Sequence, residues 1–276
     1  MALYAKSYTA ILLNIRRVMT QKIDLRRLEE ISQNASRPDR GLMIDGWSVG
    51  LSPGLAKRSR CINAFYPSAR AFEVNLAETQ AAFTSADLPC MFRITPFVFD
   101  ATLDARLEAT GYVSFDPALV MVLDLSQLQL QLAHVRATST TFQEQKDFTV
   151  AAKWAAEMRS DTARETAGLA SRWRLSMAHV SPMFAFNKAG VRVAQSVAIS
   201  EADHVGIFDV KTADAHVKQG YASALIASQL VAARDAGARV AYLQVRADNP
   251  ARRIYERFGF RGTYDYWYRA LPNDAR

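Results

Sequence analysis

The residues with the clearest chemical potential stand in two groups between positions 203 and 260. In the first group, Gly220 and Ala222 place small side chains at the predicted start of a helix, where successive backbone N–H groups can face an anion. The helix dipole adds about half a positive charge at the same point. This loop predicts a phosphate-binding site, although a turn of small residues before a helix is also a common packing arrangement.

The second group is built around a short helix further along the chain. Asn249 suits the capping position of this helix, Pro250 suits its first position, and Gly259 ends it. Tyr255 falls inside the helix and brings a phenol to the group. Tyr255 is either a core residue of an amphipathic helix or an acid–base group, and the presence of the whole pattern favours the second interpretation.

The elements that must position these groups alternate between strand and helix. Residues 205–211 are short, β-branched and bounded by polar residues, which predicts a strand. The helix that follows Gly220 is apolar on most of its surface and ends at Gly237, which suits a left-handed C-terminal cap. Residues 239–246 alternate as a second strand. The anion-binding loop therefore lies between a strand and the first helix of this unit.

Taken together, these segments resemble the acetyl-CoA-binding core of the GNAT superfamily of N-acyltransferases. The resemblance rests on Val-Lys-Gln-Gly-Tyr-Ala-Ser at 217–223, on Asn-Pro-Ala at 249–251, on Tyr255 and on Phe-Gly-Phe at 258–260. It implies that backbone amides of one loop hold the pyrophosphate of acetyl-CoA, the acyl donor, and that no metal takes part. The loop residues assigned to this role are Val217, Lys218, Gln219, Gly220, Tyr221 and Ala222.

The same resemblance implies roles for residues outside the loop. The strand at Phe208 and Val210 would hydrogen-bond the pantetheine arm and polarise the acetyl carbonyl, Asn249 would contact the same arm, and Arg252 would reach the nucleotide phosphates. Tyr255 would face the sulfur, where a phenol of pKa ~10 can protonate a thiolate whose conjugate acid has a pKa near ~8.5. The family usually has Arg or Gln at the position of Val217, and the neighbouring lysine can supply that charge.

The general base is open at this point. His204 stands six residues before Val210, close to where some family members place a carboxylate base, and a histidine of pKa ~6.5 could accept the proton of an amine. Glu201, Asp203 and Asp209 are rivals. A chain of water molecules could also remove the proton of the amine, so that no dedicated base is needed.

The first half of the chain repeats this order of elements. Gly111 keeps the glycine that ends the last helix of the second half, but Leu107 stands where Tyr255 does, and no glycine loop precedes the helix predicted at 72–83. The first half thus resembles a GNAT copy that has lost its cofactor chemistry and walls the substrate cleft. We predict its strands at 47–51, 57–63, 90–94 and 119–125, its helices at 24–33, 72–83 and 101–109, and a loop at 35–41.

The second half begins after a connector rich in Gln, Ser and Thr at 126–145. Two helices and a hairpin precede its central strand, at 146–158, 165–179, 183–187 and 191–200. The fold class is α/β (α+β), with two GNAT-like domains, each a mixed, mostly antiparallel sheet flanked by helices. We place an N-terminal extension and helix at 1–45, a degenerate GNAT-like domain at 46–128, a linker at 129–145 and the acetyl-CoA-binding GNAT domain at 146–276.

Composition narrows the class of protein. No run approaches the ~18 uncharged apolar residues of a membrane span. Two cysteines, Cys61 and Cys90, are too few for a disulfide framework, which favours reduced thiols and the cytoplasm. Residues 1–60 hold eleven Lys and Arg against five Asp and Glu, so most of the net charge of +7 is local, which argues against nucleic acid as the partner. Residues 1–18 form a basic amphipathic segment that is either a targeting peptide or an extension.

The function predicted from these patterns is acetyl-CoA-dependent N-acetyl transfer by direct attack of an amine of a small molecule or protein. The site would have to present a neutral amine, stabilise the oxyanion and protonate the thiolate. The alternative is a non-catalytic GNAT-like protein that senses acyl-CoA or holds a partner. The identity of the amine, the acyl chain length and the oligomeric state, with a homodimer as one option, stay open because fold does not fix function.

Overall fold

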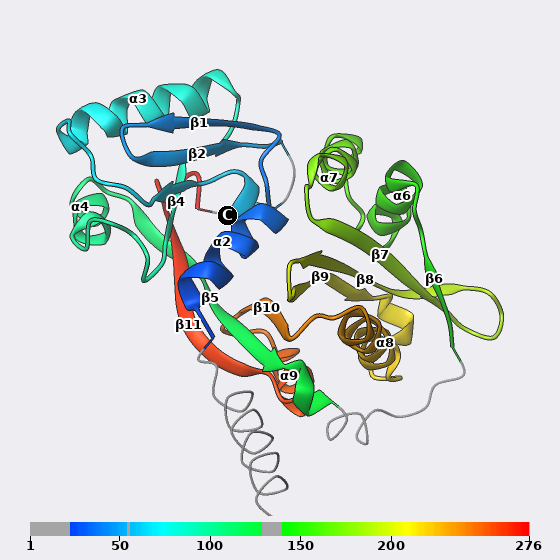
Figure 1. Cartoon of the computed structure of the whole chain (residues 1–276). Coiled ribbons are helices and arrows are strands. Elements are labelled where there is room, and N and C mark those ends of the chain that lie inside the picture. The colour runs from blue at the N-terminus through cyan, green and yellow to red at the C-terminus, as the bar shows by residue number, and fades with distance from the viewer. Residues whose placement is uncertain (1–22, 54–55, 129–139, 276) are drawn as a thin grey trace, which may run out of the picture. The chain divides into compact units, whose positions relative to one another are not determined.

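A single sheet of 11 strands is the frame on which the described residues are arranged (Figure 1). The computed structural model describes residues 23–53, 56–128 and 140–275. The strands follow the order β1-β2-β3-β4-β11-β5-β10-β9-β8-β7-β6. They are β1 (Arg40–Ile44), β2 (Trp47–Leu51), β3 (Ile62–Ala64), β4 (Met91–Ile94), β5 (Val113–Asp124), β6 (Thr141–Glu144), β7 (His179–Phe186), β8 (Arg192–Glu201), β9 (His204–Thr212), β10 (Val240–Arg246) and β11 (Arg261–Ala270).

The order of the strands shows that the two halves of the chain exchange their last strands. β5, from the first half, pairs with β10 of the second half, whereas β11, from the second half, pairs with β4 of the first. β5 and β11 also pair with each other, so they join the two halves into one sheet. Each half has one parallel pair, β3 with β4 and β9 with β10, and the remaining pairs are antiparallel. The mixed, mostly antiparallel sheet predicted from the sequence is confirmed, and the exchange of strands was not foreseen.

Helices cover the sheet and close two apolar cores. They are α3 (Phe72–Ser85), α4 (Leu103–Ala109), α6 (Phe148–Arg159), α7 (Ala163–Leu175), α8 (Tyr221–Asp235) and α9 (Arg252–Arg257). In Figure 1, α6 and α7 lie on one side of β7–β9 and α8 lies on the other. One core joins α8 and α9 to β9, β10 and the exchanged strand β5, and includes Met121, Ile207, Ile226 and Leu243. The other core lies under α3 and α4 and is centred on Trp47, Phe83 and Phe92.

The chain divides into two units, residues 1–30 and residues 31–276, and the sheet belongs to the second. The described part of the first unit contains the start of α2 (Leu25–Ala35), the helix predicted at 24–33. The Asp24 carboxylate accepts hydrogen bonds from the backbone N–H groups of Arg26 and Arg27, which satisfies donors that have no partner within the helix. The basic segment predicted at 1–18 lies outside the described residues.

Several predicted elements differ from the observed ones. The strand predicted at 57–63 is a short 3-10 helix, Lys57–Ser59, followed by β3. This turn allows consecutive basic side chains to face the same cavity, which the alternation of a strand would prevent. β1 begins inside the predicted loop 35–41, and β6 lies in the predicted connector, of which 129–139 fall outside the described residues. Both are edge strands with mostly exposed side chains, so their sequences carry no burial pattern. The domain boundaries stay predictions.

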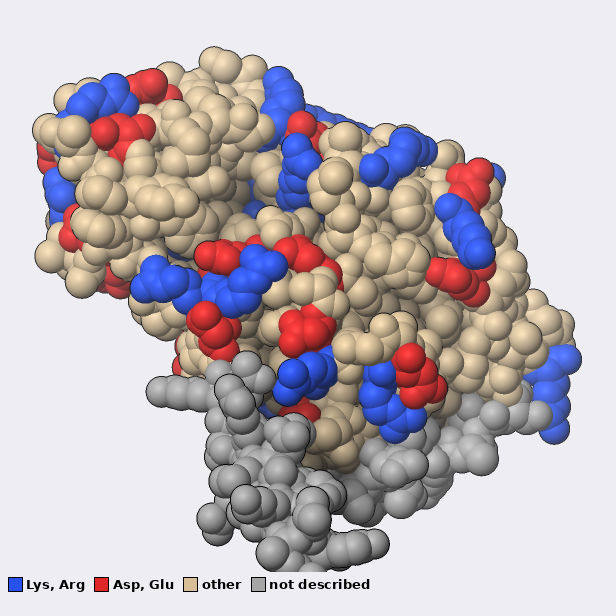
Figure 2. Space-filling view, in the orientation of Figure 1, with Lys and Arg blue, Asp and Glu red and all other residues tan. Residues whose placement is uncertain are grey.

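Figure 2 shows acidic and basic side chains interspersed over the face that it draws. No described helix has the length and apolar character needed to cross a membrane. Cys61 and Cys90 are both buried, and neither forms a disulfide bond with a described residue.

Candidate active site

The parallel strands β9 and β10 stop pairing halfway along their length. Their hydrogen-bonded register runs from His204 and Val240 to Ile207 and Leu243, whereas both strands continue beyond these residues. Within the described part of the chain, the edge of β9 that faces β10 therefore has no strand partner after Ile207. Free backbone N–H and C=O groups on such an edge can bind an extended ligand.

A β-bulge lies at the point where the strands separate. The register of β9 against β8 shifts so that Asp209 and Val210 oppose the single residue Ser196. Asp209 has φ +50°, a left-handed conformation that L-residues adopt rarely and that Asp tolerates better than most. Strained residues of this kind persist only where the surrounding structure holds them, and they cluster at functional sites.

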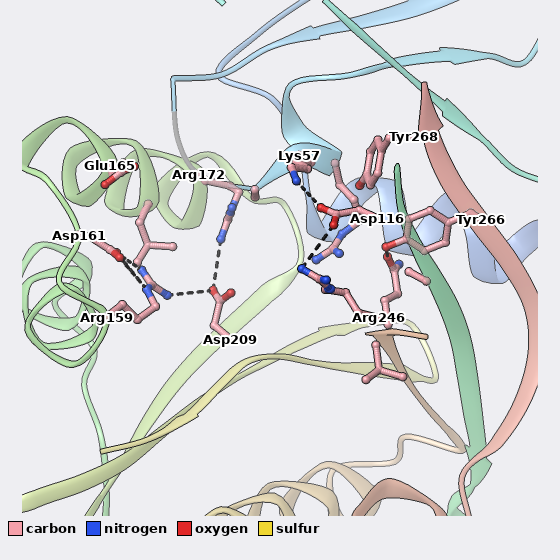
Figure 3. A pocket seen from close by; sticks show the side chains of 16 residues that line it. Lys57, Asp116, Arg159, Asp161, Glu165, Arg172, Asp209, Arg246, Tyr266 and Tyr268 are labelled. Atoms are coloured by element: carbon pink, nitrogen blue, oxygen red, sulfur yellow. Dashed lines mark hydrogen bonds and ion pairs between the residues drawn. The ribbon is translucent and has the colours of Figure 1, made fainter. Parts of the chain in front are cut away.

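A cavity of about 390 Å³ opens next to the bulge (Figure 3). This volume lies in the range of small-molecule sites, roughly 300–1,000 Å³. Both halves of the chain contribute to its wall, because the 3-10 helix and β5 come from the first half and α6, α7, β9, β10 and β11 from the second. The lining residues are Ala56, Lys57, Arg58, Asp116, Ala118, Arg159, Asp161, Glu165, Leu169, Arg172, Asp209, Gln244, Val245, Arg246, Tyr266 and Tyr268.

Two arginines hold the side chain of Asp209 on one side of the cavity. The Oδ2 atom of Asp209 lies 3.3 Å from Nη2 of Arg172 and 3.8 Å from Nη1 of Arg159. Arg159 also binds Asp161, with 3.0 Å between Nε and Oδ2. Burial lowers the pKa of Arg172. Because the two guanidinium groups come from α6 and α7, these helices fix the carboxylate at the end of β9.

A second set of charges lies on the opposite side of the cavity. The carboxylate of Asp116, on β5, forms ion pairs with Lys57 and with Arg246, the latter at 3.4 Å. Asp116 also has a positive φ, +46°. These pairs connect the 3-10 helix and β5 of the first half to the end of β10, so the cavity depends on contacts between the halves.

The start of α8 fits the anion-binding role predicted for it. Gly220 is the N-cap with φ +90°, Lys218 precedes it with φ +62°, and no side chain caps the helix. The first N–H groups of a helix have no partners within it, so an uncapped start attracts an anion. The side chain of Val217 is exposed at the edge of this loop.

The corresponding loop of the first half already contains an anion. The carboxylate of Asp45 accepts hydrogen bonds from the N–H groups of Ala69 and Arg70, at 3.0 and 2.9 Å, and from Nδ2 of Asn75, at 2.9 Å. These hydrogen bonds, that of Asn75 first, lower the pKa of Asp45 to about 2. A fixed carboxylate therefore sits where the entry to α3 could otherwise receive a phosphate.

Tyr255 is buried in the core that joins α8, α9 and β9. Its ring packs edge-on to Phe260, with centroids 6.2 Å apart, and Val210 packs against the same cluster. Burial raises the pKa of the phenol to about 12. The hydroxyl therefore stays protonated at neutral pH.

The structure separates His204 from the other predicted site residues. His204 lies at the paired end of β9, roughly 20 Å along an extended strand from Val210, and its Nδ1 is 2.8 Å from Oδ1 of Asp203. Of the rival bases, Asp209 lines the cavity. The ring of Phe208 packs edge-on to Tyr242 and faces Arg58, whose guanidinium carbon is 5.5 Å from the ring centroid.

The remaining predicted residues lie at the start of α9. Oδ1 of Asn249 accepts a hydrogen bond from the N–H of Ala251 at 2.9 Å, and Arg252 pairs with Glu256 at 2.8 Å. Their contacts with a cofactor stay predictions. The cavity residues Lys57, Arg58, Asp116, Arg159, Arg172 and Arg246 were missed, and the one sequence signal was the pair of adjacent basic residues at 57 and 58.

Comparison with known families gives one match that spans most of the chain. Residues 23–269 match the family described as "Probable histone acetyltransferase Rv0428c C-terminal". No match was found among curated proteins. Within the described residues, no group of three or more His, Cys, Asp or Glu side chains comes together as a set of metal ligands.

Solved structures share the fold at low sequence identity. A GCN5-related N-acetyltransferase from Kribbella flavida has a TM-score of 0.66 and 17% identity, with 92% of this chain and 97% of that chain covered. A tandem GNAT protein from the clavulanic acid biosynthesis pathway has a TM-score of 0.55 and 14% identity, covering 75% and 73%. A GCN5-related N-acetyltransferase from Sphaerobacter thermophilus has a TM-score of 0.54 and 17% identity, covering 71% and 65%. These likenesses establish the GNAT fold.

Proposed function

Because the chain belongs to the family of the Rv0428c C-terminal region, within the GNAT superfamily of acetyltransferases, we propose that it transfers an acetyl group from acetyl-CoA to an amine. The observation that carries this proposal is the coincidence of three features at the end of β9: the unpaired strand edge, the uncapped start of α8 and the cavity beside Asp209. The first two features suit the donor and the third suits the acceptor.

The residues of the chain fit acetyl-CoA on the side of the sheet that carries α8. The backbone N–H groups that follow Gly220 would bind the pyrophosphate, with the ammonium group of Lys218 close by. The free edge of β9 at Phe208 and Val210 would bind the pantetheine arm. When bound, acetyl-CoA supplies an acyl group activated as a thioester.

Two side chains would transfer the protons of the reaction. Tyr255 keeps its proton in an apolar core and would donate it to the departing thiolate. We place Asp209, rather than His204, beside the attacking amine, because Asp209 lines the cavity at the bulge. Its carboxylate would orient the nitrogen toward the thioester carbonyl and accept the proton that the nitrogen loses as the C–N bond forms and the C–S bond breaks.

The acceptor would enter from the cavity between the halves. The family description names a histone acetyltransferase, and a lysine side chain is an amine of the required type. A small-molecule amine also fits a cavity of about 390 Å³.

Calorimetry with acetyl-CoA tests the proposal at the donor site. We expect micromolar binding by the wild type and loss of binding in Gly220→Glu, which adds bulk and negative charge at the start of α8. Gly190→Glu is a matched control, since Gly190 also has a positive φ, +73°, and a Cβ there would meet nothing within 4 Å. Absence of binding by the wild type, or equal binding by Gly220→Glu, would contradict the donor site. Acetylation of added amines, followed by mass spectrometry, then tests transfer.

A further inference from the structure

Most of the charged side chains that line the cavity fall into two groups that pair internally. Figure 3 shows Arg159 and Arg172 directed at Asp161 and Asp209 on one side, and Lys57 and Arg246 directed at Asp116 on the other. Positive and negative side chains satisfy each other within both groups. A ligand therefore gains little from these paired cations.

Arg58 is the lining arginine that belongs to neither of these ion-paired groups. Among the described residues, no carboxylate forms an ion pair with it, and its partners are neutral. Its Nε atom is 3.2 Å from Oγ of Ser36, its guanidinium faces the ring of Phe208, and the phenol of Tyr266 lies within electrostatic range. The side chain is partly buried in the cavity wall.

The surroundings of Arg58 increase the demand for a negative charge. Taking a guanidinium group out of water without an anionic partner is costly, and an oxyanion that binds it recovers part of that cost. Arginine is suited to this role because its planar group can donate two parallel hydrogen bonds to a carboxylate or a phosphate.

Asp209 lines the same cavity and offers the complementary charge. Its closest contacts with Arg159 and Arg172 both use Oδ2, and within the described residues Oδ1 accepts no hydrogen bond. Oδ1 can therefore accept a hydrogen bond from an amine that approaches the end of β9. The cavity thus has an acceptor for N–H at Asp209 and a donor for an oxyanion at Arg58.

We propose that the acceptor is a small primary amine that also carries an oxyanion, a carboxylate or a phosphate, with Arg58 binding the oxyanion and Asp209 the amine. This inference rests on the proposed acetyl transfer for the role of the amine. A simple alkylamine, or a lysine side chain in a basic peptide, would leave Arg58 without a partner. Such acceptors should bind more weakly.

Binding to the full chain without acetyl-CoA tests the inference directly. Calorimetry would compare δ-aminovalerate and aminobutylphosphonate, which carry an oxyanion, with pentylamine, which has a similar length and none. We expect both anionic amines to bind at least about tenfold more tightly than pentylamine, the usual effect of one hydrogen-bonded charge. Equal or tighter binding of pentylamine or of a lysine peptide, or no binding of any of these amines, would overturn the inference.

Three variants assign the effect to residues. Arg58→Gln should abolish the preference for anionic amines and leave pentylamine binding unchanged, whereas Asp209→Asn should weaken all three amines. Arg58→Lys should keep part of the preference, and it replaces Arg58→Gln if the glutamine variant fails to fold. Arg261→Gln, at an exposed position on β11, is the control. A preference that persists undiminished in both Arg58 variants would overturn the role of Arg58.

The same panel separates this inference from the proposed function. If acetyl groups are transferred to pentylamine as efficiently as to δ-aminovalerate, the proposed oxyanion on the acceptor is refuted, whereas the proposed acetyl transfer is not. Conversely, binding of δ-aminovalerate that depends on Arg58, together with bound acetyl-CoA and no acetylated product by mass spectrometry, would support the ligand class and refute acetyl transfer.

Discussion

Removing the hydroxyl of Tyr255 tests whether this residue is catalytic or merely part of the core. The phenol makes no hydrogen bond with any described residue, and burial is the cause of its raised pKa. Tyr255→Phe keeps the ring and its edge-on contact with Phe260. We therefore expect the free energy of unfolding to change by less than about 1 kcal/mol, because no buried partner loses its hydrogen bond.

The expected loss of activity is much larger. Positioned general acids contribute roughly 10²–10⁴-fold to rates. Because burial raises the pKa of Tyr255 from 10.0 to about 12, the phenol is a weaker acid than free tyrosine, and we expect the lower end of this range. A hundredfold loss of kcat corresponds to about 2.7 kcal/mol in the barrier.

The assay is release of free thiol from acetyl-CoA at saturating acceptor, together with thermal unfolding of the same samples. Tyr112→Phe is a control for which we expect the reverse result. Tyr112 is buried in the first half, and its hydroxyl accepts a hydrogen bond from Nε2 of Gln80 at 3.0 Å, so this variant should lose stability and keep kcat. If Tyr255→Phe retains kcat within about threefold, or loses activity only in proportion to unfolded protein, Tyr255 is a core residue and the proton comes from elsewhere.

Three further predictions concern the frame of the site. Asp104→Ala removes the carboxylate that accepts two hydrogen bonds from buried Arg269, at 2.8 and 3.0 Å. It should lower the free energy of unfolding in denaturant by about 2–3 kcal/mol, less than for a fully buried ion pair because Asp104 is partly exposed. A loss under about 0.5 kcal/mol would contradict this prediction. Because the pKa of Asp45 is lowered to about 2, its carboxylate stabilises the folded protein fully above pH 3.8, and this stabilisation is lost as the pH falls toward about 2. Asp45→Asn should unfold at a lower temperature at pH 7 and should not show this loss of stability in acid. Gly206→Ala should cost about 1–3 kcal/mol, since its Cβ would lie 2.6 Å from the ring of Tyr242; unchanged stability would show that the rings move aside.

The donor side of the site could be predicted from the sequence because its signals are local. The glycine at the start of α8 and the spacing from Asn249 to Tyr255 fall within one unit of strand and helix, where neighbours in sequence are neighbours in space. The predicted cap differs, because Ala251 and not Asn249 is the N-cap of α9, and the side chain of Asn249 accepts its hydrogen bond in the turn before the helix. Helix caps and alternation report such local order directly. Hence the elements from β9 to α9 agree with their predicted ranges to within a few residues.

The acceptor side could not be predicted because its residues come from distant parts of the chain. Lys57 pairs with Asp116 and Arg172 with Asp209, and neither pair is visible in any local pattern. The cavity also depends on the exchange of β5 and β11 and on one extra residue in β9, which an alternating sequence does not reveal. His204 is an example. Its position in the sequence, six residues before Val210, suggested a base, but the register places it at the end of β9 that is paired with β10.

The segments from β1 to β5 and from β7 to β11 have the same order of strands and α-helices, and they differ at the position that would bind a phosphate. In the first half, the carboxylate of Asp45 occupies the entry to α3, and Leu107 stands where the second half has Tyr255. In the second half, the N-cap of α8 is a glycine without a side-chain cap. An internal carboxylate at the first site would repel a pyrophosphate, so donor binding is expected in the second half alone. We nevertheless expect the proposed reaction to need the first half, because it supplies Lys57, Arg58 and Asp116 to the cavity and β5 to the core.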